Sequence, residues 1–457
     1  MTQTGSLRTL LAIVLVVVLL TGNATADRLL KGTPVPADSV PVQNFVKHRC
    51  LTPFGNDQRI GGDREKPWSL PYRSLATDFD TTIHCLVLRF NFQLEETDDP
   101  NTTGLGHMDM SRPLDTLSDS AYIARNGYLI DPPPHDANYF NAHMQALSEY
   151  WETVSEGKIH LTWDIFPPGD DSVYQLPYSM SHYGACDFAN VIEGLEQYFI
   201  DGISLVDTAH ILDPGHPDID FSQYQAHFMF HAGSDRQNDI GFPTTCSDLF
   251  TGFIRFGGAL PVDNGTHTVR TALLMPETSI QDGRITALNA VMAHEFGHQL
   301  GLIDLYSTAT FRTQLGDFAL MDNNGFGTGV EFAGFTVGKV FGTTPLYPMA
   351  WSRAFLGLTD LVEIRNDTSD VRLLAAELYE QTGPKIAKVP ITDKEYYLLE
   401  NRITETDGLQ TFVLLDSTTS VIKGPSDSTR TLTGEYDQLM PGDLGGMLIY
   451  LVDEAVA

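Results

Sequence analysis

Basic residues are scarce in this chain. The 457 residues include 28 Lys and Arg against 59 Asp and Glu, so the formal net charge is -31 at pH 7. A surface of this charge repels nucleic acid and anionic lipid, which argues against both as partners. The charge suits divalent cations, although a salt-adapted or well-solvated exported surface explains it equally well.

Long apolar runs are absent after the N-terminus. Arg8 precedes 11 apolar residues at positions 10–20, and small residues follow up to Ala26. This pattern predicts a signal peptide over residues 1–26, cut after Ala26. A membrane anchor is the weaker alternative, because a span needs roughly 20 apolar residues. We therefore expect a secreted, extracellular protein with no stable membrane span after cleavage, and the sequence leaves its oligomeric state open.

The chain has only four cysteines and no Cys-x-x-Cys pair, which argues against a thiol redox motif and a cysteine zinc site. An even number in an exported chain favours two disulfides, with three possible connectivities. We expect Cys186 to pair with Cys246. A disulfide between Cys50 and Cys85 is the simplest use of the other two, whereas a free Cys50 could bind a metal as thiolate and keep a precursor inactive.

Composition divides the chain into three parts after the signal peptide. Residues 27–78 are rich in proline and polar residues and show little periodicity, which predicts a leader or prosegment. Residues 79–358 alternate strand-like and helix-like patterns and form the expected main domain. Residues 359–457 are β-rich and stop directly after a strand pattern, which favours a fragment of something longer. The expected fold class is α/β (α+β), without internal repeats.

Several elements within residues 79–358 have clear patterns. Apolar residues on both faces of residues 83–92 predict a central strand. Helical spacing over residues 140–154 predicts a helix that Gly157 ends. A second helix is expected from Asp187, a good N-cap residue, through residue 200. Further strands are expected at residues 159–163, 226–233 and 268–276, and the chain becomes irregular after Leu302.

The segment VMAHEFGHQLGLIDLY, which begins at Val291, contains the zinc-hydrolase pattern HExxH. His294 and His298 lie one helical turn apart, so both imidazoles can reach one tetrahedral zinc ion. Glu295 lies beside the pair as general base and takes a proton from the water whose pKa the zinc lowers. The alternative is a solvated helix face with two chance histidines. The apolar stripe expected on the opposite face of the helix consists of Ile285, Leu288, Met292, Phe296 and Leu300.

The residues after the motif extend it. Gly301 is expected to end the helix in the left-handed conformation and to turn the chain back sharply. That turn carries Asp304, six residues after His298, to the metal as a third ligand. Three protein ligands and one water leave the open position that catalysis needs. Asp304 could instead cap a loop or bind calcium. His231 is then the outside candidate for the third ligand, although a core histidine is its commoner explanation.

The segment HEFGHQLGLIDLY resembles the signature HExGHxxGLxDxY of the immune inhibitor A family of secreted bacterial metallopeptidases. Four further segments are similar to segments of that family, although each alone is a weak signal. The resemblance then extends over residues 80–455. The four segments are FHAGSD, DFALMDNNGFG, PLYPMAWSRAFLGL and EYYLLENR.

The resemblance implies a zinc-dependent endopeptidase that is made as a secreted precursor, with residues 79–358 as its zinc metallopeptidase catalytic domain. The implied fold is metzincin-like, with a twisted mixed sheet, a backing helix and the zinc-binding helix. Met321 becomes a candidate for a Met-turn beneath the zinc, although an ordinary core methionine is an equal alternative. One departure from the family is Leu451, because relatives often carry histidine at that position.

Calcium is a further implication of the resemblance. Asp213, Asp218 and Asp220 offer oxygen ligands in one loop region, and Asp235 and Asp239 follow. None of them has the spacing of an EF-hand. A solvated acidic loop is therefore an equal alternative.

The predicted function is hydrolysis of peptide bonds in extracellular proteins, with protein or peptide substrates as partners. Zn2+ would be held by His294, His298 and Asp304, with Glu295 as catalytic base and Ca2+ as an additional cofactor. One alternative is a non-catalytic exported metal-binding or adhesion module on the same fold, against which the intact Glu295 argues. A second alternative is a zinc hydrolase that acts on something other than peptides.

Overall fold

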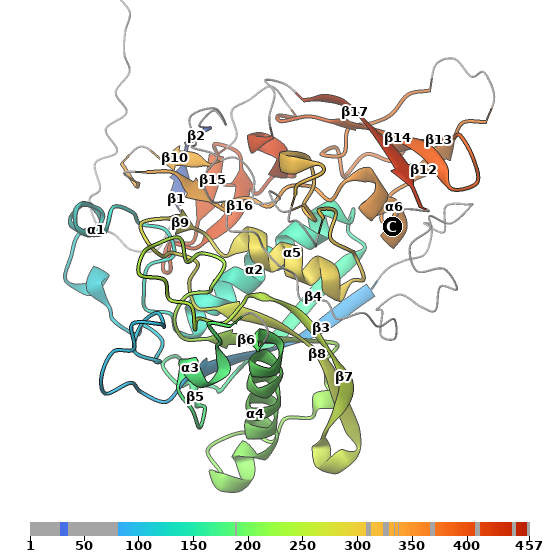
Figure 1. The fold of residues 1–457 in the computed structure, drawn as a ribbon. Coiled ribbons are helices and arrows are strands. Elements are labelled where there is room, and N and C mark those ends of the chain that lie inside the picture. Colours follow the sequence, from blue (N-terminus) through green and yellow to red (C-terminus); the bar gives the residue numbers. More distant parts are fainter. Residues whose placement is uncertain are drawn as a thin grey trace, which may run out of the picture.

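A computed structural model describes residues 28–34, 81–187, 190–307, 312–322, 329–332, 334–336, 338–365, 371–406, 412–440 and 445–454. The predicted signal peptide, Cys50 and most of the predicted leader lie outside these residues. Within them, a few helices pack against several mixed sheets (Figure 1). At this level of description the expected α+β class is confirmed.

The central sheet has the strand order β4-β3-β6-β8-β7. The first four strands in this order are parallel, whereas β7 is antiparallel to β8 and forms one edge. The side chains from Cys85 to Phe90 on β3 are buried on both faces of the sheet, which explains the unbroken apolar pattern of this strand. The strands are β3 (Thr81–Asn91), β4 (Ile159–Phe166), β6 (Ala226–His231), β7 (Gly252–Val262) and β8 (His267–Pro276), with β5 (Tyr174–Gln175) beside β3.

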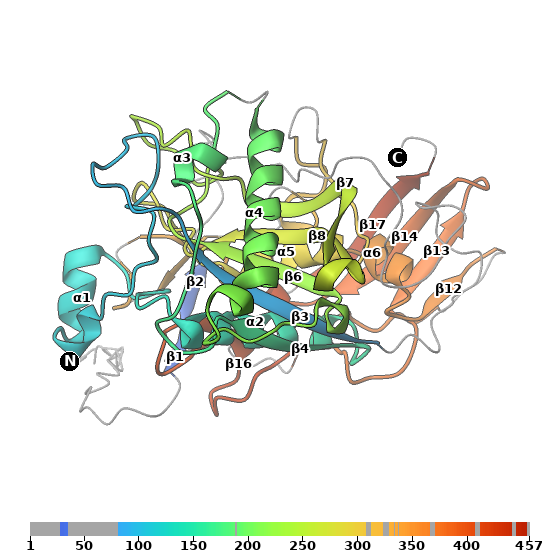
Figure 2. The same ribbon diagram turned by 90° about the horizontal axis from the view of Figure 1, so that it is seen from below.

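Helices cover both faces of the central sheet (Figures 1 and 2). On one face α2 (Ala137–Val154) packs beside α5 (Asn289–Gln299), and α4 (Val191–Leu212) crosses the other face. The Asp136 carboxylate caps α2 by accepting the first amides of the helix. Gly157 follows the end of α2 in the left-handed region, as predicted.

The second predicted helix begins later than expected. Asp187 does not cap it, because α4 begins at Val191 after Asn190 and continues to Leu212. The chain before the helix is fixed by other contacts: Cys186 forms a disulfide with Cys246, and the carbonyls of Ala185 and Cys186 accept from Arg236. These tertiary contacts override the local capping preference of Asp187.

Three smaller sheets lie above α2 and α5 in Figure 1. One has the order β12-β13-β14-β17 and packs on α6, and the others have the orders β2-β10-β11-β9 and β1-β15-β16. The predicted strands at the C-terminal end of the chain are therefore present. The elements are α1 (Asp119–Asn126), α3 (Met180–Tyr183), α6 (Ala350–Leu356), β1 (Arg28–Leu30), β2 (Gly32–Pro34), β9 (Ile285–Thr286), β10 (Val330–Phe332), β11 (Val340–Phe341), β12 (Leu361–Glu363), β13 (Ile386–Pro390), β14 (Glu395–Arg402), β15 (Phe412–Leu415), β16 (Ile422–Ser426) and β17 (Gly446–Asp453).

The first residues of the predicted leader belong to the folded body. β1 pairs with β15, and β2 pairs with β10, both antiparallel. Leu30 is 4% exposed and packs in a second apolar cluster with Val413, Leu415 and Ile422. The main apolar core includes residues from Ile83 to Tyr450, on both sides of the predicted boundary at residue 358. That boundary stays a prediction.

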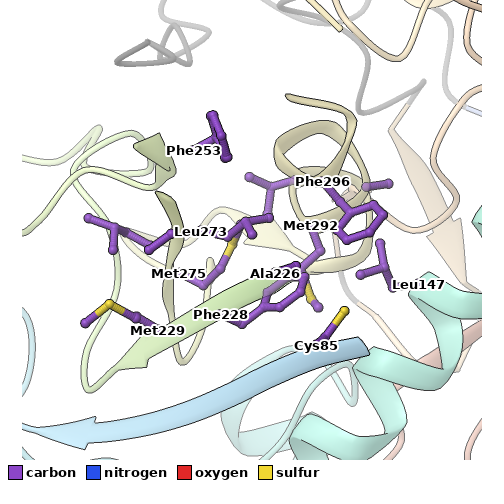
Figure 3. Packing of buried hydrophobic residues seen from close by; sticks show 14 of the residues in the cluster. Cys85, Leu147, Ala226, Phe228, Met229, Phe253, Leu273, Met275, Met292 and Phe296 are labelled. Atoms are coloured by element: carbon purple, nitrogen blue, oxygen red, sulfur yellow. The ribbon is translucent and has the colours of Figure 1, made fainter. Parts of the chain in front are cut away.

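Helix α5 packs directly on the central sheet. Figure 3 shows Met292 and Phe296 projecting from α5 into the space between β6 and α2, with Cys85 on β3 nearby. Cys85 is a free, fully buried thiol, and burial raises its pKa far above the ordinary value. The expected disulfide between Cys50 and Cys85 is therefore wrong, because an apolar core position encloses the Cys85 thiol. In the part of the chain described here, no helix is both long and apolar enough to cross a membrane.

Leu30→Ala tests whether the start of the leader is structural. We expect the free energy of unfolding to fall by about 2–4 kcal/mol, because the change leaves a cavity between β1, β15 and β16. Urea unfolding of the full chain measures this loss. Lys31→Ala is the control, because Lys31 is exposed. Equal stability of the parent and the Leu30→Ala protein would show that β1 does not contribute to the fold.

Candidate metal centre

The helix that carries the motif is buried on all sides. Every residue of α5, from Asn289 to Gln299, is buried, which contradicts the alternative of a solvated helix face with two chance histidines. Ile285 does not belong to the helix but to β9. The central sheet, through β7 and β8, and the helix α2 pack against α5. His294 and His298 therefore face protein rather than water.

The start of α5 is held by polar groups from distant segments. Asp131 Oδ2 accepts from the Leu288 amide at 3.3 Å. The Asn289 side chain donates to the Ile422 carbonyl at 2.5 Å and lies 3.0 Å from Nδ1 of His143. Burial lowers the pKa of His143 to about 3, so its ring is neutral. A helix without a side-chain cap of its own is thus fixed by α2, β16 and Asp131.

The end of α5 turns as the sequence predicts. Gly301 has φ +97°, its amide donates to the His298 carbonyl, and the Leu302 amide donates to the Gly297 carbonyl. These two bonds and the left-handed glycine form a Schellman motif. The reversed chain returns Asp304 to the helix beside both histidines. The predicted left-handed turn at Gly301 is confirmed, whereas the role of Asp304 as a metal ligand stays a prediction.

The candidate ligand atoms of His294, His298 and Asp304 lie close together. Asp304 Oδ1 lies 3.3 Å from Nε2 of His294 and 3.3 Å from Nε2 of His298. The side chains of His294, His298 and Asp304 are 1%, 1% and 3% exposed. Among the described residues, they form one group of His, Cys, Asp or Glu side chains whose ligand atoms lie within 4.8 Å of one another.

Backbone carbonyls determine which nitrogen of each histidine faces Asp304. Nδ1 of His294 lies 2.8 Å from the Leu320 carbonyl, and Nδ1 of His298 lies 2.9 Å from the Leu302 carbonyl. A carbonyl can only accept, so Nδ1 carries the proton in each neutral ring and Nε2 presents its lone pair. Both lone pairs then point toward the Asp304 carboxylate.

This donor set fits a zinc ion. Two atoms that are each ~2.0–2.1 Å from a tetrahedral zinc are roughly 3.3 Å apart, which matches both histidine-to-aspartate distances. Imidazole nitrogen and carboxylate oxygen are ordinary zinc ligands. Among the described residues the group has three members, which leaves one coordination position of a tetrahedral ion for water or substrate.

Glu295 is held by the edge strand of the central sheet. Its Oε2 accepts from the Phe253 amide on β7 at 2.7 Å, and the carboxylate is fully buried. The Phe253 ring lies over the imidazole of His298, with the ring centroids 6.3 Å apart. β7 thus contacts both the candidate base and one candidate ligand. The carboxylate is fixed in orientation by a main-chain group that no sequence motif marks.

Met321 lies against the motif helix. A Cβ on Gly297 would lie 2.7 Å from Sδ of Met321, so the absence of a side chain at Gly297 lets the methionine pack on α5 next to His298. The Met321 carbonyl accepts from the Leu305 amide, directly after Asp304, at 2.8 Å. Met321 is buried in the main apolar core, and its role as a hydrophobic floor of the site stays a prediction.

The other candidate residues lie elsewhere. The disulfide between Cys186 and Cys246 is present as predicted. His231 is buried in the core between Phe92 and Tyr198, outside the metal group. Leu451 is 63% exposed on β17.

The predicted calcium ligands do not come together among the described residues. Asp213 accepts from Gly215, Asp218 pairs with His210, and Asp220 accepts from Ser222 and Gln223. Asp235 is buried and accepts from Asn238 and Thr251, whereas Asp239 lies near Asp282. Each of the first three carboxylates caps or pairs locally, as in the alternative of a solvated acidic loop.

Several groups that build the site were not predicted. Phe253 belongs to an ordinary strand pattern, and Asp131 belongs to a proline-rich turn, 163 positions before His294. Leu302 and Leu320 act through their carbonyls, which any residue type supplies. No protein-family model matches the chain, and no curated protein matches it. Any proposed function for this protein therefore depends on the geometry of the candidate site and on the HExxH motif.

The buried Asp131 predicts a pH dependence of stability. Burial raises its pKa from 3.8 to about 7, although the Leu288 amide and His135 act in the opposite direction. The folded protein therefore holds the Asp131 proton more tightly than the unfolded chain does. This proton stabilises the fold fully below pH 3.8, and the stabilisation is lost as the pH rises to about 7. Asp131→Asn keeps an oxygen for the Leu288 amide and abolishes this loss.

We expect the unfolding free energy of the Asp131→Asn protein, relative to the parent, to rise by on the order of 4 kcal/mol between pH 4 and pH 7. Urea unfolding at both pH values measures the difference. Asp218→Asn is the control, because that side chain is 79% exposed. A constant difference between parent and Asp131→Asn would show that Asp131 does not retain its proton in the folded protein.

Proposed function

We propose that the protein is a secreted zinc endopeptidase, related to the immune inhibitor A family, that hydrolyses peptide bonds in extracellular proteins. The observation that carries the proposal is the convergence of His294 Nε2, His298 Nε2 and Asp304 Oδ1 next to the Glu295 carboxylate. A twisted mixed sheet, the backing helix α2 and the motif helix α5 support a metzincin-like fold. The position of Met321 beneath α5 supports it further.

The residues of this chain have separate roles in the proposed reaction. Bound zinc would supply a Lewis acid that lowers the pKa of water and polarises the substrate carbonyl. Glu295 Oε1, on the other side of the carboxylate from the Phe253 hydrogen bond, accepts the proton of the attacking water and returns it to the leaving amine. The Phe253 amide fixes the direction of that transfer. The carbonyls of Leu302 and Leu320 keep each Nε2 turned toward the metal.

The candidate site is almost completely buried, which limits the access of a substrate. A polypeptide cannot reach His294, Glu295 and His298 in the described conformation, since each is at most 4% exposed. Such closure agrees with a precursor in which the site is covered until activation. The non-catalytic alternative is less favoured, because a structural zinc site is closed by a fourth protein ligand. The metal group contains three members among the described residues, and a general base lies beside it.

Glu295→Gln tests the proposed catalytic role. We expect kcat on an unfolded protein substrate to fall about 10²- to 10⁴-fold, because the amide cannot accept the water proton. The zinc content per chain should not change, since Glu295 is not among the ligands. Both proteins are assayed before and after limited proteolysis of the leader, with metal analysis of each sample.

Asp304→Ala is the complementary variant, because it removes a ligand and keeps the base. It should lose zinc together with activity. A parent protein that binds zinc but cleaves no peptide substrate after activation would contradict the proposed function. A Glu295→Gln protein that is as active as the parent would contradict the assigned role.

The Phe253 amide can be tested by comparing Phe253→Pro with Phe253→Ala. Both lose the ring, but only proline lacks the N–H that Glu295 accepts. An edge strand tolerates proline where the N–H points away from the sheet, as it does here. We expect kcat to be about tenfold lower for the proline variant than for the alanine variant, with equal zinc content. Equal kcat values would show that Glu295 does not need this hydrogen bond.

A further inference from the structure

One short segment touches the surroundings of all three candidate ligands. Within residues 318–322, the Leu320 carbonyl accepts from His294, the Met321 carbonyl accepts from Leu305 next to Asp304, and the Met321 side chain packs on Gly297 next to His298. A displacement of this segment would therefore change the direction of every ligand at once.

The buried carboxylate of Asp322 ties the end of this segment to the residues that precede it in the chain. Asp322 Oδ2 accepts from the amides of Gln314, Leu315 and Gly316, at 2.7, 2.5 and 3.1 Å. These bonds hold the preceding turn but do not connect the segment to the remainder of the protein. A connection to the C-terminal part of the chain runs through Tyr347, whose carbonyl accepts from the Leu320 amide at 3.4 Å.

Tyr347 is held by residues of the C-terminal part of the chain. Its amide donates to Asp437 Oδ1 at 3.0 Å, and its hydroxyl donates to the Gly434 carbonyl at 2.9 Å. Arg402 forms an ion pair with Asp437 and directs its Nη2 to the Tyr347 carbonyl, at 3.5 Å. Nη1 of Arg402 reaches the Phe318 carbonyl, also at 3.5 Å.

The charged groups around Arg402 are deeply buried. Arg402, Asp437 and Glu400 are 0% exposed, and Glu377 and Arg353 are 1% exposed. Arg402 lies 3.1 Å from Glu400 and 3.3 Å from Glu377, and Arg353 pairs with Glu400 on its other side. A buried charged cluster of this kind adds little net stability compared with an apolar packing of the same volume, but it fixes orientation strictly.

We propose that Arg402 and Asp437 are positioning residues for the metal centre, acting through Tyr347 and Leu320 on the imidazole of His294. The inference rests on the proposed function, because it takes His294 to be a zinc ligand. The C-terminal strands then form part of the metal-binding unit and do not follow it as an independent module. Outer groups that orient ligating histidines contribute about 10- to 100-fold to metal affinity in proteins of this kind.

The test is the zinc affinity of Asp437→Asn and Arg402→Lys, measured on the full chain by competition with a chelator. We expect zinc to bind about 10- to 100-fold more weakly, because the His294 imidazole is no longer held toward Asp304. The visible absorption of the cobalt-substituted protein should change as well, since it reports ligand geometry rather than stability. Urea unfolding in the presence of a chelator shows that each metal-free variant is folded under the conditions of the assay.

Tyr450→Phe is the matched control. It removes the 2.6 Å hydrogen bond from Tyr450 to Glu400 in the same buried cluster, but it keeps both partners of the hydrogen bonds of Tyr347 and Phe318. Its zinc affinity and cobalt spectrum should equal those of the parent, even where stability falls. If Asp437→Asn and Arg402→Lys do not fold, Tyr347→Phe replaces them, because it removes only the bond to Gly434. That variant should also bind zinc more weakly than Tyr450→Phe.

The outcomes separate the inference from the proposed function. Folded variants that bind zinc as tightly as the parent, with an unchanged cobalt spectrum, overturn the positioning role alone. Equal zinc affinities of the Tyr347→Phe and Tyr450→Phe proteins would also overturn the positioning role alone. A parent protein that binds no zinc overturns the proposed function together with this inference.

Discussion

Two hydrogen bonds from imidazole nitrogens to backbone carbonyls determine which nitrogen of each histidine faces Asp304. His294 and His298 each donate from Nδ1, to Leu320 and Leu302 respectively, and each therefore turns a lone pair toward Asp304. Three electron-pair donors at such short range repel one another in the absence of a cation or a proton. Their arrangement is stable only because the surrounding fold holds each of them separately. The helix, the turn at Gly301 and the segment 318–322 are the parts that do so.

That requirement explains why a helix with five polar side chains is buried on every side. α5 has little solvent contact through which its histidines could reorient, and its ends are fixed by the Schellman turn and by Asp131 with Asn289. Packing of Met292 and Phe296 against β6 and α2 prevents rotation of the helix. β7 adds the Phe253 amide, which fixes Glu295 relative to the same helix. Candidate base and candidate ligands are thus fixed to one rigid element.

The features that could be predicted from the sequence are local ones. Histidines one turn apart and a glycine that reverses the chain before Asp304 follow from helix geometry alone. The buried run of β3 and the periodicity of α2 are equally local. The errors have non-local causes: Cys85 is enclosed by the core, Asp187 is displaced by the contacts of Cys186, and Ile285 is drawn into β9 by pairing with Val340. Phe253, Asp131 and Arg402 could not be identified, because main-chain donors and buried charges have no spacing signature.

Non-local contacts also cross the predicted boundary at residue 358. Sequence composition changes there, and a change of composition normally indicates a new domain. The chain of contacts from His294 through Leu320 and Tyr347 nevertheless ends at Asp437 and Arg402, beyond that residue. α2 also packs against β16, and β1 pairs with β15. If the orientation of a candidate ligand depends on residues 402 and 437, the smallest unit able to hold the metal includes the β-rich region. A composition boundary then separates strand-rich from helix-rich sequence without separating one function from another.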